Sequence, residues 1–179
     1  IRPNFLACDL HPDYMATRYA LERSEGDGTP AIRIQHHHAH IAACMVENGL
    51  TGDQPVIGVA FDGTGYGDDR AIWGGEFLIA DYRSYQRSTH LAYVPLPGGD
   101  KAAREPWRMA LAWLWRCGFP WSENLTPMRQ GLNQTALPQQ QTEALNRQLE
   151  TGLNSPPTSS MGRLFDAVSA LIGVRQLAN

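Results

Sequence analysis

The sequence predicts an α/β fold built on a mixed sheet, and three observations support this. Two strand-then-helix patterns follow one another near the start of the chain, as expected for parallel strands. An almost uninterrupted apolar run at residues 56–61 is typical of a strand covered on both faces. Strand-like segments at residues 72–80 and 91–96 then suggest an antiparallel meander. We therefore expect a mixed sheet flanked by helices.

The first part of the chain contains the two strand-then-helix units. Residues 5–8 predict a short buried strand, and residues 9–22 a turn followed by a helix. The apolar side of that helix is expected to contain Tyr14, Met15, Tyr19 and Leu21. After a loop at residues 24–30 and a strand at 31–34, a second helix should end at Asn48-Gly49.

The second part of the chain predicts helices. Apolar residues recur at helical spacing between residues 102 and 116, which indicates a packed, tryptophan-rich helix. A further helix is expected at residues 139–150, inside a stretch rich in Gln and Asn. Ser159-Ser160 should cap a last helix at residues 161–172, with a buried face formed by Leu164, Val168 and Leu171.

Composition excludes several classes of protein. A chain of 179 residues with a net charge of −3 has no basic stripe for nucleic acid. No apolar run approaches the ~20 residues that span a bilayer. Three widely spaced cysteines suit reduced thiols in the cytoplasm. Because the chain opens on Ile1 without an initiator Met, we expect it to be a piece of a longer protein.

The run at residues 36–40 (HHHAH) is the strongest candidate for chemistry. His36 and His40 are four residues apart, so on a helix their imidazoles share a face and can hold one metal ion. His37 and His38 would point elsewhere. A zinc protease needs Glu directly after the first His, and His37 occupies that position, so this hydrolytic class is disfavoured. The alternative is a polar helix start whose histidines are hydrogen-bonded near the surface.

A glycine-rich segment follows the apolar strand at residues 62–67 (DGTGYG). Backbone N–H groups at Gly63 and Gly65 can approach a phosphate, Thr64 can donate a hydrogen bond, and Asp62 can bind a cation. The segment is neither a Walker A loop nor a Rossmann fingerprint. A plain hairpin turn is the alternative. Beside the histidine pair, Asp62 becomes a candidate third metal ligand. Asp9, which follows the first strand, could face the same crevice at the carboxyl ends of the strands, but a turn that caps a helix is the favoured interpretation.

Five motifs in order resemble the carbamoyltransferase HypF family of nickel-iron hydrogenase maturation proteins. They are residues 7–14 (ACDLHPDY), 36–40 (HHHAH), 60–67 (AFDGTGYG), 73–77 (WGGEF) and 159–168 (SSMGRLFDAV). The resemblance implies an actin-like, Hsp70-like (ribonuclease H-like) nucleotide-binding fold related to the tRNA threonylcarbamoyl transferases. It further implies a partial carbamoyltransferase domain over residues 1–179, with a metal- and nucleotide-binding lobe at 1–100 and a helical portion at 101–179.

The resemblance also implies a reaction. Family members use carbamoyl phosphate and ATP to make carbamoyl-adenylate, and pass the carbamoyl group to the C-terminal cysteine of the partner HypE for cyanide ligand synthesis. The family's metal-binding histidines map onto His36 and His40, while Asp62, Gly63 and Gly65, with the neighbouring Thr64, belong to the nucleotide and metal cleft. The expected divalent metal is zinc or iron, which imidazole ligands suit, with magnesium accompanying the nucleotide. Further ligands are expected beyond Asn179, so this stretch alone should be inactive.

Two other functions stay open at this point. A sugar-kinase-like phosphotransferase would use Asp62 and the glycines but leave the histidines without a role. A non-catalytic interaction module that depends on a metal would use the histidines only as structural ligands.

Overall fold

The computed structural model describes residues 3–131 and 138–178, which form two compact units. Unit 1 comprises Ile1–Ala60 and Thr64–His90, and unit 2 comprises Phe61–Gly63 and Leu91–Asn179. Phe61–Gly63 lie in the middle of β3 (Val56–Tyr66), a single continuous strand whose other residues all belong to unit 1.

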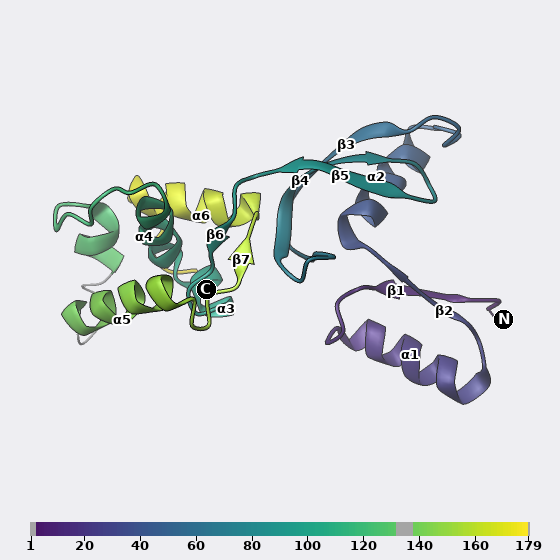
Figure 1. Ribbon diagram of the computed structural model, residues 1–179, viewed down its shortest axis with the longest axis horizontal. Helices are drawn as coiled ribbons and strands as arrows, with labels where there is room; N and C mark the ends of the chain where they lie inside the picture. The colour runs from purple at the N-terminus through teal and green to yellow at the C-terminus, as the bar shows by residue number, and fades with distance from the viewer. Residues whose placement is uncertain (1–2, 132–137, 179) are drawn as a thin grey trace. The chain divides into compact units, whose positions relative to one another are not determined.

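Unit 1 begins with a parallel pair of strands and one helix (Figure 1). β1 (Leu6–Asp9) pairs with β2 (Ala31–Ile34) so that Asp9 lies opposite Ile34, and α1 (Met15–Asp27) connects the two strands. Gly28, at φ 75°, ends α1 in the left-handed conformation that favours glycine. The C-terminal ends of the two strands therefore lie side by side, and α2 starts just after the end of β2.

α2 (His36–Glu47) carries the histidine run. The side chain of Gln35 caps it by accepting a hydrogen bond from the His38 N–H at 2.8 Å. The helix ends at Asn48, which is followed by Gly49 at φ 67°. Its buried residues are His37, His38, Ile41 and Met45.

The remaining strands of unit 1 form a meander. β4 (Ile72–Ala80) lies between β3 and the antiparallel β5 (Tyr85–His90). The fully buried Glu76 of β4 binds Arg87 Nε at 2.7 Å and accepts from the N–H groups of Gly74 and Gly75. Because its charge is paired and its oxygens are hydrogen-bonded, this carboxylate can be buried in the sheet.

Unit 2 is mainly helical. α4 (Pro106–Arg116) packs on α6 (Met161–Leu171), and α5 (Pro138–Thr151) contributes Leu145 and Leu149 to the buried residues. The smaller elements are β6 (Val94–Pro95), its antiparallel partner β7 (Pro157–Thr158), α3 (Asp100–Arg104) and a single π-helical turn, η1 (Pro127–Gly131). Within the described residues, no helix combines the length and the apolar character needed to cross a membrane.

The predicted α/β class with a mixed sheet is confirmed, but several details of the first unit differ. α1 extends to Asp27, into the predicted loop, and exposes Met15 (86%) and Tyr19 (62%) on its predicted apolar side. The residues that α1 buries are the small Thr17 and Ala20. Small side chains allow the helix to lie close to the two-stranded sheet. Val46 of α2 is exposed as well.

The interpretation of β3 was wrong in two respects. The strand does not stop before the glycine-rich segment but continues through it to Tyr66, and the chain turns only after Gly67. Its apolar side chains are not covered on both faces, because Ile57 is 79% and Val59 51% exposed. The short alternation of buried and exposed residues along the strand indicates one covered face.

The later elements also differ from the sequence prediction. The strand expected at residues 91–96 shrinks to β6, and β5 was not predicted, because its residues are polar. The helix expected at 102–116 is divided at Pro106 into α3 and α4, since proline lacks the N–H of an uninterrupted helix. On α6, Ala167 and Ala170 are buried, while Val168 is exposed.

Ser160 provides a test of the predicted cap on α6. Its buried Oγ accepts from Arg163 N at 3.2 Å and lies 2.9 Å from the carbonyl oxygens of Asp62 and Gly63, which share its single hydrogen. Ser160→Ala should lower the free energy of unfolding by about 1–2 kcal/mol, measured by urea denaturation. The control Ser169→Ala changes a serine inside α6 and should have little effect. Equal stability of the two variants would contradict this role.

Asp81 provides a pH test of the turn between β4 and β5. Hydrogen bonds from the N–H groups of Arg83 and Ser84, both 2.7 Å, hold the pKa of Asp81 below its ordinary value. A carboxyl whose pKa is lowered by folding stabilises the fold above its unfolded pKa and loses that contribution as the pH falls. Asp81→Ala should therefore lower the melting temperature at pH 7, and the difference should shrink as the pH falls below 4 or so. A difference that does not depend on pH would contradict the assignment.

Candidate metal and nucleotide site

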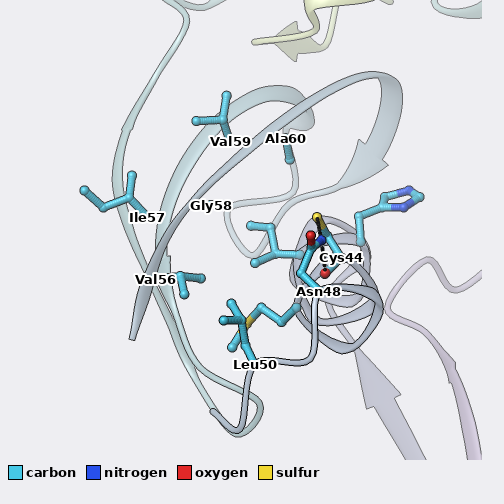
Figure 2. A pocket seen from close by; sticks show the side chains of 11 residues that line it. Cys44, Asn48, Leu50, Val56, Ile57, Gly58, Val59 and Ala60 are labelled. Atoms are coloured by element: carbon cyan, nitrogen blue, oxygen red, sulfur yellow. Dashed lines mark hydrogen bonds between the residues drawn. The ribbon is translucent and has the colours of Figure 1, made fainter. Parts of the chain in front are cut away.

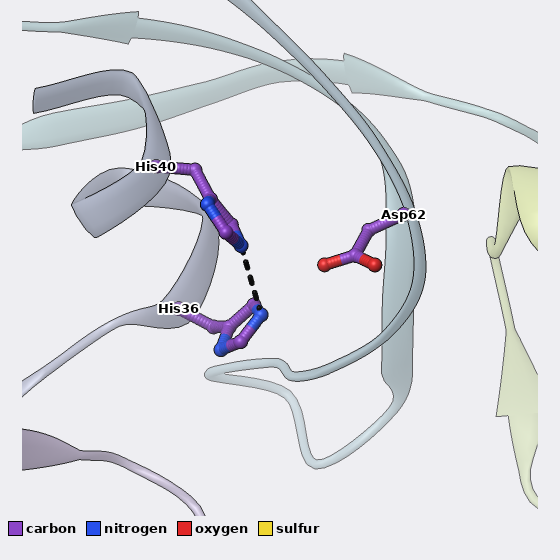
Figure 3. Close-up of side chains that lie close together, drawn as sticks. All are labelled: His36, His40 and Asp62. Atoms are coloured by element: carbon purple, nitrogen blue, oxygen red, sulfur yellow. Dashed lines mark hydrogen bonds between the residues drawn. The ribbon is translucent and has the colours of Figure 1, made fainter. Parts of the chain in front are cut away.

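His36 and His40 lie one turn apart on α2, and a nitrogen of each ring points toward the other (Figure 3). Their Nε2 atoms are 3.2 Å apart, and the two rings are nearly perpendicular at 81°. Two imidazole nitrogens bound to one tetrahedral zinc ion at ~2.05 Å lie roughly 3.3 Å apart. The spacing therefore suits two ligands of one ion, and equally a hydrogen bond from one ring to the other.

Asp62 on β3 points its carboxylate toward this pair (Figure 3). One ligand atom each from His36, His40 and Asp62 lies within 4.8 Å of the others. Asp62 Oδ1 accepts a hydrogen bond from the N–H of Gly63 at 2.6 Å. The three residues that the sequence predicted as metal ligands thus form one group, with two nitrogen donors and one oxygen donor.

Asp9, at the end of β1, holds the His36 ring from its other side. Asp9 Oδ2 lies 2.7 Å from His36 Nδ1, and the two side chains are mostly buried, at 17% and 25% exposed. Asp9 Oδ1 accepts from the backbone N–H of His11 at 2.8 Å. The helix-capping interpretation of Asp9 accounts for one carboxylate oxygen only, and its contact with His36 was missed.

Two glycines allow β3 to approach α2 closely. A Cβ added at Gly65 would lie 2.4 Å from His37 Cε1 and 3.1 Å from His36 Cδ2. A Cβ at Gly58 would lie 2.2 Å from Ile41 Cδ1. The distances of 2.4 and 2.2 Å are shorter than real Cβ contacts, so a side chain at either position would displace the His37 ring or the Ile41 side chain, or move strand and helix apart.

His37 and His38 lie outside the facing pair, as their helical positions predict, although the His37 ring lies edge-on to the His36 ring with centroids 5.3 Å apart. His37 is fully buried, with Nδ1 3.3 Å from Gln35 Nε2, and Gln35 Nε2 also donates to the Tyr66 carbonyl. His38 Nε2 donates to the carbonyl oxygen of Asp81 at 2.7 Å. Both side chains serve to fix α2 to its surroundings.

The glycine-rich segment is a strand, and the start of α6 contacts it. A Cβ at Gly162 would lie 2.8 Å from Gly63 Cα, so glycine is needed where α6 meets β3. Thr64 is exposed, and Gly65 faces the imidazole rings. The sequence analysis assigned Ser160 only a capping role and no role to Gly162. The predicted roles of Gly63, Thr64 and Gly65 in nucleotide binding stay predictions.

An apolar cavity of about 290 Å³ lies between α2 and β3 (Figure 2). The residues that line it include His40, Ile41, Met45 and Val56. Most of the side chains that line it are apolar, and Lys and Arg are not among them.

Comparison with protein families places these residues in a known context. The family model described as "HypF Kae1-like domain" matches residues 1–47, and "Carbamoyltransferase, Kae1-like Domain, second subdomain" matches residues 58–179. The chain belongs to the HypF family. The resemblance noted from its five motifs is confirmed, and His36, His40 and Asp62 all fall in the matched segments.

Carbamoyltransferases from other organisms match nearly the whole chain. Carbamoyltransferase HypF2 of Cupriavidus necator is 48% identical over 98% of this chain, and carbamoyltransferase HypF of Rhizobium leguminosarum bv. viciae is 43% identical over 98%. A crystal structure of full-length HypF in the phosphate- and nucleotide-bound form is 40% identical, with a TM-score of 0.82 over 99% of this chain. The chain spans only 20–22% of the length of these three proteins.

Gly65 provides a test of the packing that brings strand and histidines together. Gly65→Ala should destabilise the fold by about 1–3 kcal/mol, because the methyl group must displace the rings of His37 and His36. The control is Gly63→Ala, whose Cβ would meet its nearest neighbour, Arg163, at an ordinary 3.8 Å. Chemical denaturation of both variants measures the difference, and equal loss of stability would show that close packing at Gly65 is not required.

Proposed function

We propose that this chain forms part of the centre at which a HypF protein transfers a carbamoyl group from carbamoyl-adenylate to a cysteine thiol of HypE. The names of its relatives support carbamoyl transfer as the reaction. The adenylate, made from carbamoyl phosphate and ATP, and the acceptor HypE follow from the motif resemblance. Because the chain spans about a fifth of those relatives, we expect this stretch alone to be inactive.

The observation that supports this proposal most is the convergence of His36, His40 and Asp62. Two imidazoles and a carboxylate suit zinc or iron, while phosphates and carboxylate oxygens suit magnesium. The donor set fits a catalytic ion, since three protein ligands leave a position open for substrate. Such an ion would supply Lewis-acid polarisation and charge neutralisation at the phosphate end of the adenylate.

The protein residues have separate tasks in this proposal. His36 and His40 supply nitrogen ligands from a rigid helix, and Asp62 supplies an oxygen ligand from β3. The hydroxyl of the exposed Thr64, between Gly63 and Gly65, would donate to the nucleotide phosphate. That a related HypF crystallised with phosphate and nucleotide is consistent with a nucleotide site in this family.

The transfer step needs no nucleophile from this chain. The thiol sulfur of the acceptor forms a C–S bond to the carbamoyl carbon, the C–O bond to the phosphate breaks, and AMP leaves with the electron pair. The thiol proton passes to solvent. Cys8, Cys44 and Cys117 are all free and have no part in this step. We place the reaction in the cytoplasm, where the acceptor thiol stays reduced.

Removing the imidazoles tests the metal site. In the intact protein, His36→Ala and His40→Ala should each lower bound metal, measured by elemental analysis, and reduce carbamoyl transfer at least about 100-fold. The control His90→Ala removes an imidazole from the end of β5, outside the three-residue group, and should retain both. Full metal content and normal transfer in the first two variants would refute the proposal.

A further inference from the structure

We propose that Asp9 is a positioning residue that fixes the tautomer and orientation of His36, so that His36 Nε2 is available to bind a metal ion. This inference rests on the proposed function, because it concerns the same site. It assigns to Asp9 a role that neither the motif resemblance nor the spacing of the histidines implies. Asp9, His36, His40 and the two groups that donate to Asp9 all belong to unit 1.

The sheet topology places Asp9 beside His36. Asp9 is the last residue of β1 and lies opposite Ile34, the last residue of β2, while Leu10 N donates to the Ile34 carbonyl at 3.0 Å. Only Gln35 separates Ile34 from His36, the first residue of α2. Because parallel strands end at the same edge, the carboxylate at the end of one strand faces the helix that starts after the other.

Three hydrogen bonds fix Asp9 in place. Its backbone carbonyl accepts from Thr17 Oγ1 at 3.2 Å, and Thr17 is fully buried on α1. Its Oδ1 accepts from the His11 N–H at 2.8 Å, which leaves Oδ2 for His36 Nδ1 at 2.7 Å. The Thr17 bond holds the backbone of Asp9 and the His11 bond orients its carboxylate, so the carboxylate can in turn orient the ring.

The contact selects one tautomer of His36. An ionised carboxylate only accepts hydrogen bonds, so His36 Nδ1 carries the proton and Nε2 presents its lone pair. That lone pair lies 3.2 Å from His40 Nε2. Carboxylates that accept a hydrogen bond from a metal-binding histidine fix the ring and raise its basicity in the same way. Asp9 thus prepares the ring before any ion binds.

Asp9→Asn separates this role from turn capping. Asn can keep the His11 contact with its Oδ1, but its NH₂ group then donates toward His36 Nδ1 and favours the opposite tautomer, with the proton on Nε2. A residue that only caps the turn should tolerate this change. A positioning residue should not, because a protonated Nε2 cannot bind metal.

The experiment uses the intact protein, prepared without metal, as wild type and as four variants. For each, it measures the melting temperature and the affinity for added Co²⁺. Asp9→Asn and Asp9→Ala should weaken Co²⁺ binding about 10- to 100-fold, and Asp9→Asn should leave the melting temperature near wild type. The control Asp13→Asn changes an exposed carboxylate that pairs with Arg18, and should bind Co²⁺ as wild type does. His36→Ala is the reference for loss of the ligand itself.

The outcomes distinguish the inference from the proposed function. If His36→Ala abolishes binding but Asp9→Asn binds Co²⁺ within about twofold of wild type, the positioning role is overturned and the metal site stands. If His36→Ala binds Co²⁺ as wild type does, the proposed metal site fails and the inference fails with it. Loss of affinity in both Asp9 variants with an intact control supports the inference.

Discussion

The candidate site depends on one steric constraint, the close approach of α2 to β3. Gly58 and Gly65 remove the side chains that would separate helix and strand, and the imidazoles of His36 and His37 occupy the space at Gly65. Because β3 is continuous through Asp62, the same packing that seats the histidines sets the carboxylate opposite them. Rigid elements on both sides hold donor atoms more accurately than loops can. A glycine that looks like a turn signal in the sequence is here a packing requirement.

The features of the fold and of the candidate site that could be predicted from the sequence are those determined by contacts between residues close together in the chain. The α/β class, the strand Ile72–Ala80 and the helix that carries the histidine run follow from periodicity and capping within about 15 residues. The helical spacing of four also predicted that His36 and His40 share a face. By contrast, the exposure of Met15 and Ile57 depends on which elements cover them, and no local pattern contains that information. The end of β3 was predicted wrongly for a related reason. Its glycines allow close packing against α2, and the local sequence does not distinguish that role from a turn.

The histidine run shows how one helix divides four identical side chains among different tasks. Successive residues on a helix are rotated by about 100°, so His36 and His40 share a face while His37 and His38 point in two other directions. His37 is buried against the Gln35 amide, and His38 reaches the Asp81 carbonyl. These two anchor the helix on which the other two present their nitrogens. The sequence predicted the separation correctly but not the anchoring partners, which lie up to 43 residues away.

Asp9 illustrates why a structural and a functional interpretation of one residue need not exclude each other. The sequence favoured a capping turn, and Asp9 Oδ1 does bind the His11 N–H. A carboxylate has a second oxygen, however, and the parallel register of β1 and β2 directs it to His36. In the proposed role of Asp9, the turn contact matters for function because it limits the rotation of the carboxylate. A carboxylate that caps a turn at the end of one parallel strand can therefore also accept a hydrogen bond from the first residue of the helix that follows the other strand.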